Sequence, residues 1–191
     1  EGPKYRVSDV KLAGDLQQVP EKELQDLIKI KKDDIFNREK ITESTKAMNS
    51  RLGNDGFAFS NVNAIPEINK EEHTTTFTFF IDPGRKVYVR RIDIEGNDRT
   101  RDDVIRREFR QIESGWYAAD KIDRSKTRLN RTQFFSDVNI ETPAVPGSTD
   151  QVDLKVKVTE RNTGSIMFGA GFSSAEGVVG SFNVTQANFL G

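Results

Sequence analysis

The sequence predicts an α+β fold in which two tandem units, each a three-stranded sheet with two helices on one face, precede a short two-stranded tail. Three observations predict it. The chain of 191 residues repeats itself after about eighty residues, which is typical of tandem structural units. Each repeat combines the alternating pattern of strands with the apolar spacing of helices. The tail, residues 164–191, holds a single charged residue, Glu176.

The repeat consists of three matches that occur in the same order in both halves. The matched pairs are residues 4–14 with 86–96, residues 59–63 with 135–139, and Phe77, Phe79 and Ile81 with Leu154, Val156 and Val158. Residues 4–14 and 86–96 each end in a glycine that suits a turn. We therefore expect units at residues 1–83 and 84–163, joined only at 82–85, and a further unit before residue 1.

In the first unit, the pattern predicts strands at residues 4–14, 61–65 and 74–81. Pro20 suits the start of a first helix. A second helix is expected from about Arg38, with apolar residues at 41, 48 and 52 on its buried face and a stop at Gly53 and Gly56. Residues 66–73 should form a long hairpin loop.

In the second unit, the pattern predicts strands at residues 86–96, 137–141 and 151–158. A first helix should follow Thr100 and bury Ile105, Phe109 and Ile112, and a second should begin near Asp120. Three short strands can bury one face only if the helices form a second layer on it, so the other face of each sheet should meet solvent.

The tail alternates between apolar and small or polar residues. Its apolar positions include Ile166, Phe168, Phe172 and Phe182. Strands of about 9–11 residues with one apolar face are typical of barrels that cross a membrane. A soluble hairpin of a third domain has the same pattern, so the residues alone leave both interpretations open.

The composition argues against an enzyme or a metalloprotein. The chain has no cysteine, which excludes thiolate zinc sites. It has one histidine, His73, which excludes His-pair metal sites, and no nucleophile–base pair can be drawn from that single histidine. We expect no cofactor, no metal and no catalysis. No run approaches the roughly 20 apolar residues of a membrane-spanning helix.

The charges are unevenly distributed between the units. Residues 1–83 hold 12 basic and 15 acidic residues, whereas residues 84–163 hold 17 basic residues, 12 of them arginine, and 14 acidic ones. The arginines alternate with acids and lack an aromatic platform, so we expect no nucleic-acid binding. A solvated helix face and a docking surface for a protein both remain open, because arginine is enriched at interfaces.

Several stretches of the chain resemble the POTRA domains of BamA-type outer-membrane protein insertases. They are residues 89–98, 106–111, 128–131, 145–148, 150–153 and 160–164, with looser similarity at 52–53, 56–58 and 66–69. The resemblance implies the fourth and fifth POTRA domains in the periplasm, followed by the first two strands of an outer-membrane barrel. Ile166, Phe168, Phe172 and Phe182 would then face lipid.

Glu108 is the first candidate site residue. On the predicted helix it lies at the edge of the buried stripe, and no basic residue lies three or four positions away. It therefore either pairs with another part of the chain or binds a partner. The resemblance implies docking of a BamD-like outer-membrane lipoprotein, and we expect Glu108, Arg107 and Arg110 to take part.

The second candidate site is the sheet edge, since an unpaired edge can accept an added strand. The resemblance implies that unfolded outer-membrane protein clients bind there. The residues expected at the exposed edges are Ser60, Asn61, Val62, Ser136, Asp137 and Val138. A protected edge that pairs with nothing is the alternative.

Related functions also fit the pattern. The chain could be a POTRA receptor of a two-partner or autotransporter secretion system, or an envelope-stalk adaptor that only spaces its partners. Two strands cannot close a barrel. We therefore expect the tail to self-associate, with its outer ladder supplied by another chain or sheet edge.

Overall fold

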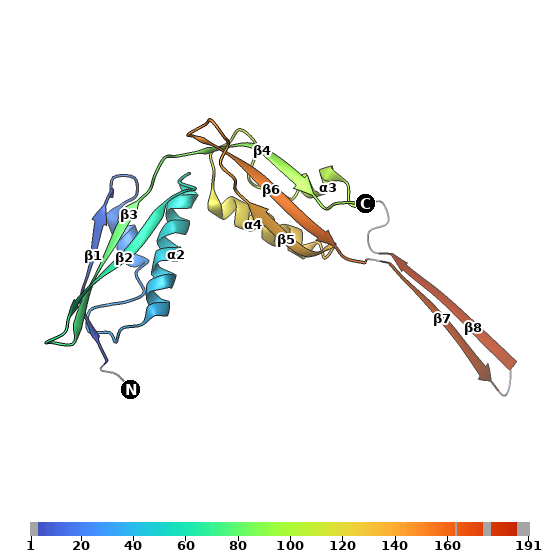
Figure 1. Cartoon of the computed structure of the whole chain (residues 1–191). Coiled ribbons are helices and arrows are strands. Elements are labelled where there is room, and N and C mark those ends of the chain that lie inside the picture. The colour runs from blue at the N-terminus through green and yellow to red at the C-terminus, as the bar shows by residue number, and fades with distance from the viewer. Residues whose placement is uncertain (1–3, 163, 174–176, 187–191) are drawn as a thin grey trace.

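A computed structural model describes residues 4–162, 164–173 and 177–186. It consists of two α+β units in succession and a hairpin that extends away from the second unit (Figure 1). Within the described residues, no helix is long and apolar enough to cross a membrane. The predicted α+β class with two repeated units is confirmed.

The first unit has a three-stranded sheet in the order β1-β3-β2. β1 runs parallel to β3, and β2 runs antiparallel to it. Apolar residues from the sheet and from both helices form a core of their own, in which Phe79 and Met48 are fully buried. The elements are β1 (Arg6–Gly14), α1 (Glu21–Asp26), α2 (Arg38–Asn54), β2 (Asn61–Asn69) and β3 (Thr74–Asp82).

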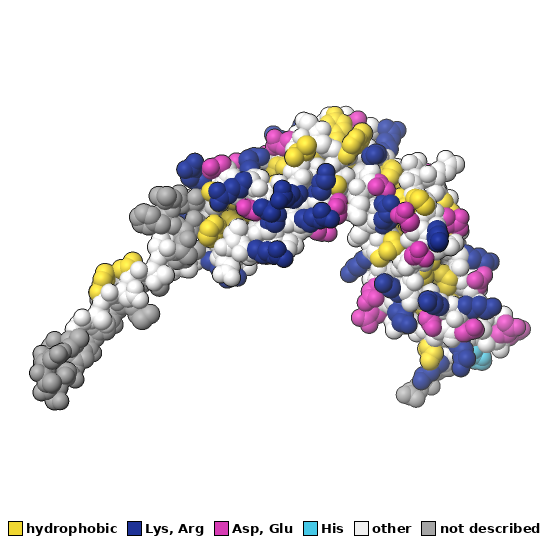
Figure 2. All heavy atoms as spheres, turned by 180° about the vertical axis from the view of Figure 1, so that it is seen from behind, with side chains coloured by type: hydrophobic (Ala, Val, Ile, Leu, Met, Phe, Trp, Pro, Cys, Tyr) yellow, Lys and Arg dark blue, Asp and Glu magenta, His cyan; other side chains and the backbone are white. Residues whose placement is uncertain are grey.

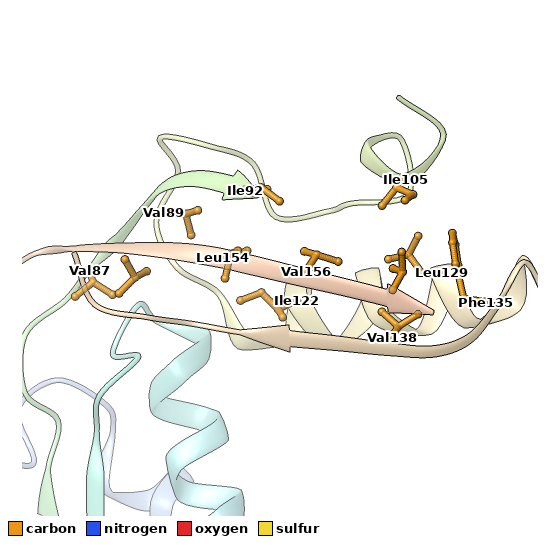
Figure 3. Packing of buried hydrophobic residues seen from close by; sticks show 12 residues of the cluster. Val87, Val89, Ile92, Ile105, Ile122, Leu129, Phe135, Val138, Leu154 and Val156 are labelled. Atoms are coloured by element: carbon orange, nitrogen blue, oxygen red, sulfur yellow. The ribbon is translucent and has the colours of Figure 1, made fainter. Parts of the chain in front are cut away.

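The second unit repeats this topology, with a sheet in the order β4-β6-β5. Figure 3 shows its core, in which Leu154 and Val156 of the sheet face Ile122 and Leu129 of the long helix. The elements are β4 (Tyr88–Glu95), α3 (Asp102–Arg106), α4 (Ala119–Arg131), β5 (Phe135–Glu141) and β6 (Gln151–Glu160).

The tail forms a separate two-stranded sheet. β7 (Gly164–Ser173) and β8 (Gly177–Gln186) pair antiparallel, so that Phe168 lies opposite Phe182. β7 begins four residues after the end of β6. The hairpin therefore follows the second unit with little linker.

The first helix of the second unit is shorter than predicted. α3 ends at Arg106, and Ile112, expected in the core, is 66% exposed. The buried side chain of Gln111 explains the difference. Its amide donates to the Trp116 carbonyl at 3.0 Å and accepts from the Ala118 N–H at 3.0 Å. These bonds fold residues 111–118 into a turn, and Ile112 points outward.

α2 ends at Asn54, between the two glycines expected to stop it, and Gly56 has a left-handed φ of 102°. One strand boundary in the first unit differs from the prediction. β2 extends to Asn69, so residues 66–69 are strand rather than loop. The Asn69 side chain accepts from the N–H groups of Glu71 and Glu72 and thereby closes a short turn.

The units touch beyond their linker, so the expectation that only residues 82–85 join them is wrong. The N–H of Val87 donates to the Gly56 carbonyl at 2.9 Å. Asn54 accepts a hydrogen bond from the Asp120 N–H, also at 2.9 Å. A Cβ at Gly53 would lie 2.9 Å from the Cβ of Ala119. The end of α2 is thus packed against the start of α4.

Candidate functional site

β1 and β4 lie at sheet edges, but the chain covers the start of each. In the first unit, Val7 donates to the Asp34 carbonyl and accepts from the Asp33 N–H, both at 2.8 Å. In the second unit, Val89 bonds in the same way with Gly115 at 2.9 Å and Ser114 at 2.7 Å. These connecting segments occupy backbone groups that an added strand would need.

β2 and β5 are the open edges. Among the described residues, the backbone of β2 forms hydrogen bonds only with β3, and that of β5 only with β6. Every second residue of each strand therefore turns its N–H and C=O groups to solvent. Such a row of groups can pair with another extended chain.

Pro66 limits the open row on β2. Proline has no N–H to donate to β3, so Pro66 occupies a position at which an N–H would face the open edge. Val62, Ala64 and Ile68 share its parity and face the same way. The continuous donors on this edge are therefore Val62 and Ala64, and a strand would pair with residues 61–65.

The predicted edge residues differ in what they contribute. The side chains of Val62 and Val138 are buried in the cores, so only their backbone can serve a partner. Ser60 precedes β2, and its hydroxyl bonds with the Asn49 side chain at 3.0 Å. Ser136 lies at an irregularity of β5, where its hydroxyl donates to the Thr159 carbonyl. The regular edge of β5 thus begins at Asp137.

Glu108 has a partner within the chain. It lies beyond the end of α3, and its Oε2 is 2.8 Å from Nη2 of Arg128 on α4. Its Oε1 is 3.8 Å from Nε of Arg107. The helical pattern could not reveal Arg128, because that residue lies on another helix. Of the two alternatives for this carboxylate, the structure shows pairing with another part of the chain, whereas a role in docking stays a prediction.

Around this pair lies a basic face on α4. Lysine and arginine side chains gather on the second unit in the view from behind (Figure 2). A hollow of about 530 Å³ on this face is lined by Arg110, Lys121, Asp123, Arg124, Thr127, Arg128 and Arg131. Within the described ranges, Arg110, Lys121 and Arg131 have no carboxylate within 4.0 Å. The face therefore carries positive charge that the chain leaves unbalanced.

Sequence reasoning pointed to Arg107 and Arg110 and missed the arginines of α4. Arg124, Arg128 and Arg131 recur at spacings of four and three, which places them on one side of a helix. This spacing is visible in the sequence and could have identified the face. No group of three or more His, Asp or Glu residues in the described parts of the chain could hold a metal ion.

The residues expected to face lipid lie in the hairpin. Ile166, Phe168 and Phe172 belong to β7, opposite Val184, Phe182 and Val178, and their side chains lie outside the described residues. Phe182 on β8 is 64% exposed, and Val184 on the same side of the strand is 55% exposed. The described part of the hairpin thus shows two large apolar side chains to its surroundings.

Comparison with known proteins matches both units to one family. Its profile, described as POTRA, a surface antigen variable number repeat, fits residues 5–84 and 87–161. The chain belongs to the POTRA family. The fold described above, with open β2 and β5 edges, is therefore that of two successive POTRA domains.

Curated relatives of these POTRA domains include outer membrane protein assembly factors BamA. That of Neisseria meningitidis serogroup B is 39% identical over 191 residues, and that of Nitratidesulfovibrio vulgaris is 35% identical over 196. Each match covers the whole of this chain and 24% of the relative. The chain thus spans about a quarter of the length of these relatives.

Solved structures agree with this assignment. The crystal structure of POTRA3-5 of Haemophilus influenzae BamA has a TM-score of 0.79 at 33% identity, over 84% of this chain and 63% of that one. Haemophilus ducreyi BamA lacking POTRA domains 1-3 has a TM-score of 0.76 at 38% identity, over 97% of this chain and 35% of that one. The second match therefore extends beyond the two POTRA domains into the hairpin.

Proposed function

We propose that the two POTRA domains lie in the periplasm and bind unfolded outer-membrane proteins during their assembly into the outer membrane. The binding mode is strand addition at the β2 and β5 edges. The observation that carries this proposal is the row of backbone groups on each strand that no described segment covers. The names of the BamA relatives supply the cellular setting.

Strand addition suits a receptor of this kind. The main-chain groups of an added strand are the same whatever its sequence, so one edge can bind many clients. The covered starts of β1 and β4 restrict such pairing to one long edge in each domain. The process is binding alone and requires no covalent chemistry or cofactor.

We further propose that β7 and β8 are the first strands of an outer-membrane β-barrel. Each is 10 residues long, which matches the roughly 9–11 residues that a tilted strand needs to cross the hydrocarbon layer. The match of the longer BamA structure beyond the two domains supports the same assignment. Because the linker from β6 is short, the second domain would lie next to the membrane.

Cysteine crosslinking tests the edges, since the natural chain has no cysteine of its own. Single cysteines replace Asn63 on β2 or Asn139 on β5 in the full chain, and an unfolded outer-membrane protein carries a thiol-reactive crosslinker. We expect adducts at both positions. Matched controls replace Arg6 on β1 and Arg90 on β4, which are exposed and adjoin the covered residues Val7 and Val89. Equal yields at the controls would refute strand addition and favour an adaptor that only spaces its partners.

A second function is proposed for the basic face of α4, namely docking of an acidic surface on a BamD-like lipoprotein. The unbalanced charges of Arg110, Lys121 and Arg131 support it. Arg107 lies at the margin of this face and is exposed. Glu108 would act indirectly, by holding the guanidinium of Arg128 in place.

A further inference from the structure

The outer faces of the two sheets differ in chemistry at equivalent positions. The pairing registers superpose Ala13, Ile65 and Phe80 of the first domain on Glu95, Glu141 and Lys157 of the second. Phe80 of β3 lies opposite Ala13 of β1, and Lys157 of β6 lies opposite Glu95 of β4. Ile65 on β2 and Glu141 on β5 lie diagonally from Phe80 and Lys157. An apolar trio in one domain thus corresponds to a charged trio in the other.

In the second domain, ion pairs cover this face. Lys155 Nζ lies 3.2 Å from a Glu95 carboxylate oxygen, and Lys157 Nζ lies 3.9 Å from one of Glu141. Arg90 and Asp153 pair at 2.6 Å on the same sheet. An apolar side chain laid on this face would separate these charges from water, which is unfavourable.

In the first domain, the equivalent positions carry exposed apolar side chains, beside the polar Asn63 and Thr78. Phe80 is 45% exposed and Ile65 is 49% exposed. Phe80 points away from the core, since its neighbours Phe79 and Ile81 are both buried. Ile65 lies on β2 itself, at the end of the stretch in which the backbone of the edge can accept a partner. Ile65 therefore places an apolar side chain of this face at the open edge.

We propose that the β2 edge selects an amphipathic strand whose apolar side chains pack on Ile65, which lies diagonally next to Phe80. A strand added to β2 would run about 4.8 Å from it and place every second side chain on the outer face. The side chain beside Ile65 packs on it directly. Phe80 on β3 lies beyond Ile65 as seen from the added strand and extends the apolar surface there. The β5 edge, with its charged face, does not favour such a strand.

This inference rests on the proposed strand addition and specifies the client. The edge fixes an extended backbone, and Ile65 favours an apolar residue beside it on the outer face. Strands that turn one face to lipid in a membrane barrel have this alternation. The first domain would thus recognise the lipid-facing side of a client strand, which the second domain would ignore.

The probe is a fluorescent peptide with the sequence of residues 164–173 of this chain, which has the required alternation. Its control has serine in place of Ile166, Phe168 and Phe172. Binding to the full chain is measured by fluorescence anisotropy.

The double variant Ile65→Glu/Phe80→Lys gives the first domain the chemistry of the second. We expect it to weaken binding of the probe about tenfold, as loss of one or two apolar contacts would. The serine peptide should bind weakly to both proteins.

Two further variants separate this inference from strand addition itself. Ala64→Pro removes an N–H from the open edge and leaves the pairing with β3 in place. The double variant Glu141→Ile/Lys157→Phe gives the second domain an apolar face and should raise binding. If Ala64→Pro abolishes binding and Ile65→Glu/Phe80→Lys leaves it unchanged, strand addition stands and the selectivity is refuted. If Ala64→Pro has no effect, strand addition at β2 is refuted as well.

Discussion

Asn54, the last residue of α2, accepts a hydrogen bond from the backbone N–H of Asp120 in the first turn of α4, with 2.9 Å between Oδ1 and N. The residue at the N-cap of α4 is Ala118, whose side chain cannot accept such a bond. The first domain thus supplies the cap of a helix in the second. Covalent linkage at residues 82–85 is only one part of the junction.

The variant Asn54→Ala should destabilise the second domain by about 1 kcal/mol, the usual effect of losing an N-cap acceptor. Unfolding in urea, followed through Trp116 in the second domain, measures it. Asn54→Asp is the control, because its carboxylate still accepts and also interacts favourably with the helix dipole. Equal destabilisation by both variants would show that the hydrogen bond is not responsible.

Gly53 allows the two helices to approach. A Cβ there would lie 2.9 Å from the Cβ of Ala119, closer than side chains tolerate. Gly53→Val should therefore separate the ends of α2 and α4 and change the angle between the domains, which small-angle scattering can detect. Adding Ala119→Gly to a Gly53→Ala variant should restore the natural scattering curve. A curve unaffected by Gly53→Val would mean that the junction does not depend on this contact.

Much of the fold follows from the sequence because it rests on regular patterns. Alternation identified the strands, and the glycines that match in the repeat, Gly14 and Gly96, both adopt positive φ against a neighbouring backbone carbonyl. The shortened α3 was missed because its cause is the buried amide of Gln111, a tertiary contact. The Glu108–Arg128 pair was missed for the same reason, since local spacing says nothing about a second helix.

Reversal of charge on the basic face should weaken docking of the lipoprotein. Arg110→Glu combined with Arg131→Glu is expected to reduce affinity by about 2 kcal/mol or more if these groups meet desolvated carboxylates. Titration calorimetry measures it. A matched control reverses Lys29 and Lys32 in the first domain. A loss of affinity in the control equal to that of the test variant would indicate a general effect of charge.

Glu108→Lys tests the indirect role of Glu108, because it places a third cation beside Arg128 and Arg107. We expect weaker docking, by about 2–5 kcal/mol if the arrangement of arginines is desolvated by the partner. The charge exchange Glu108→Arg/Arg128→Glu should recover the fold and part of the affinity. Unchanged affinity in Glu108→Lys would show that the pair serves only the domain itself.

Acid should destabilise the second domain through Glu160. Burial raises the pKa of the Glu160 carboxyl, but hydrogen bonds from Thr100 and from the Arg99 N–H outweigh it, so the pKa lies below its usual range. A carboxyl whose pKa is lowered by folding stabilises the protein above the unfolded pKa. This stability is lost as the pH falls through the folded pKa.

Urea unfolding at pH 7 and at pH 3 tests this effect. Glu160→Gln should reduce stability at pH 7 and make it less dependent on pH, whereas Glu67→Gln on exposed β2 should do neither. Asp153, whose pKa the hydrogen bond from Arg90 lowers, contributes in the same direction and keeps part of the pH dependence in Glu160→Gln. A full pH dependence in Glu160→Gln would refute the assignment to Glu160.

Removal of residues 165–191 should leave both POTRA domains folded and abolish self-association. Each domain has its own buried core, and the core residues lie outside the tail. A two-stranded hairpin is only marginally stable in water. This one shows Phe182 and Val184 to solvent and has two edges along its β7–β8 ladder, so pairing with a second chain is favourable.

Sedimentation velocity should give oligomers for the full chain and a monomer for residues 1–164. Replacing Phe182 and Val184 with serine in the full chain is the matched control, and it should weaken association without shortening the chain. Oligomers that persist after the deletion would place the contact on the domains, with the β2 edge and its apolar face as the next surface to test.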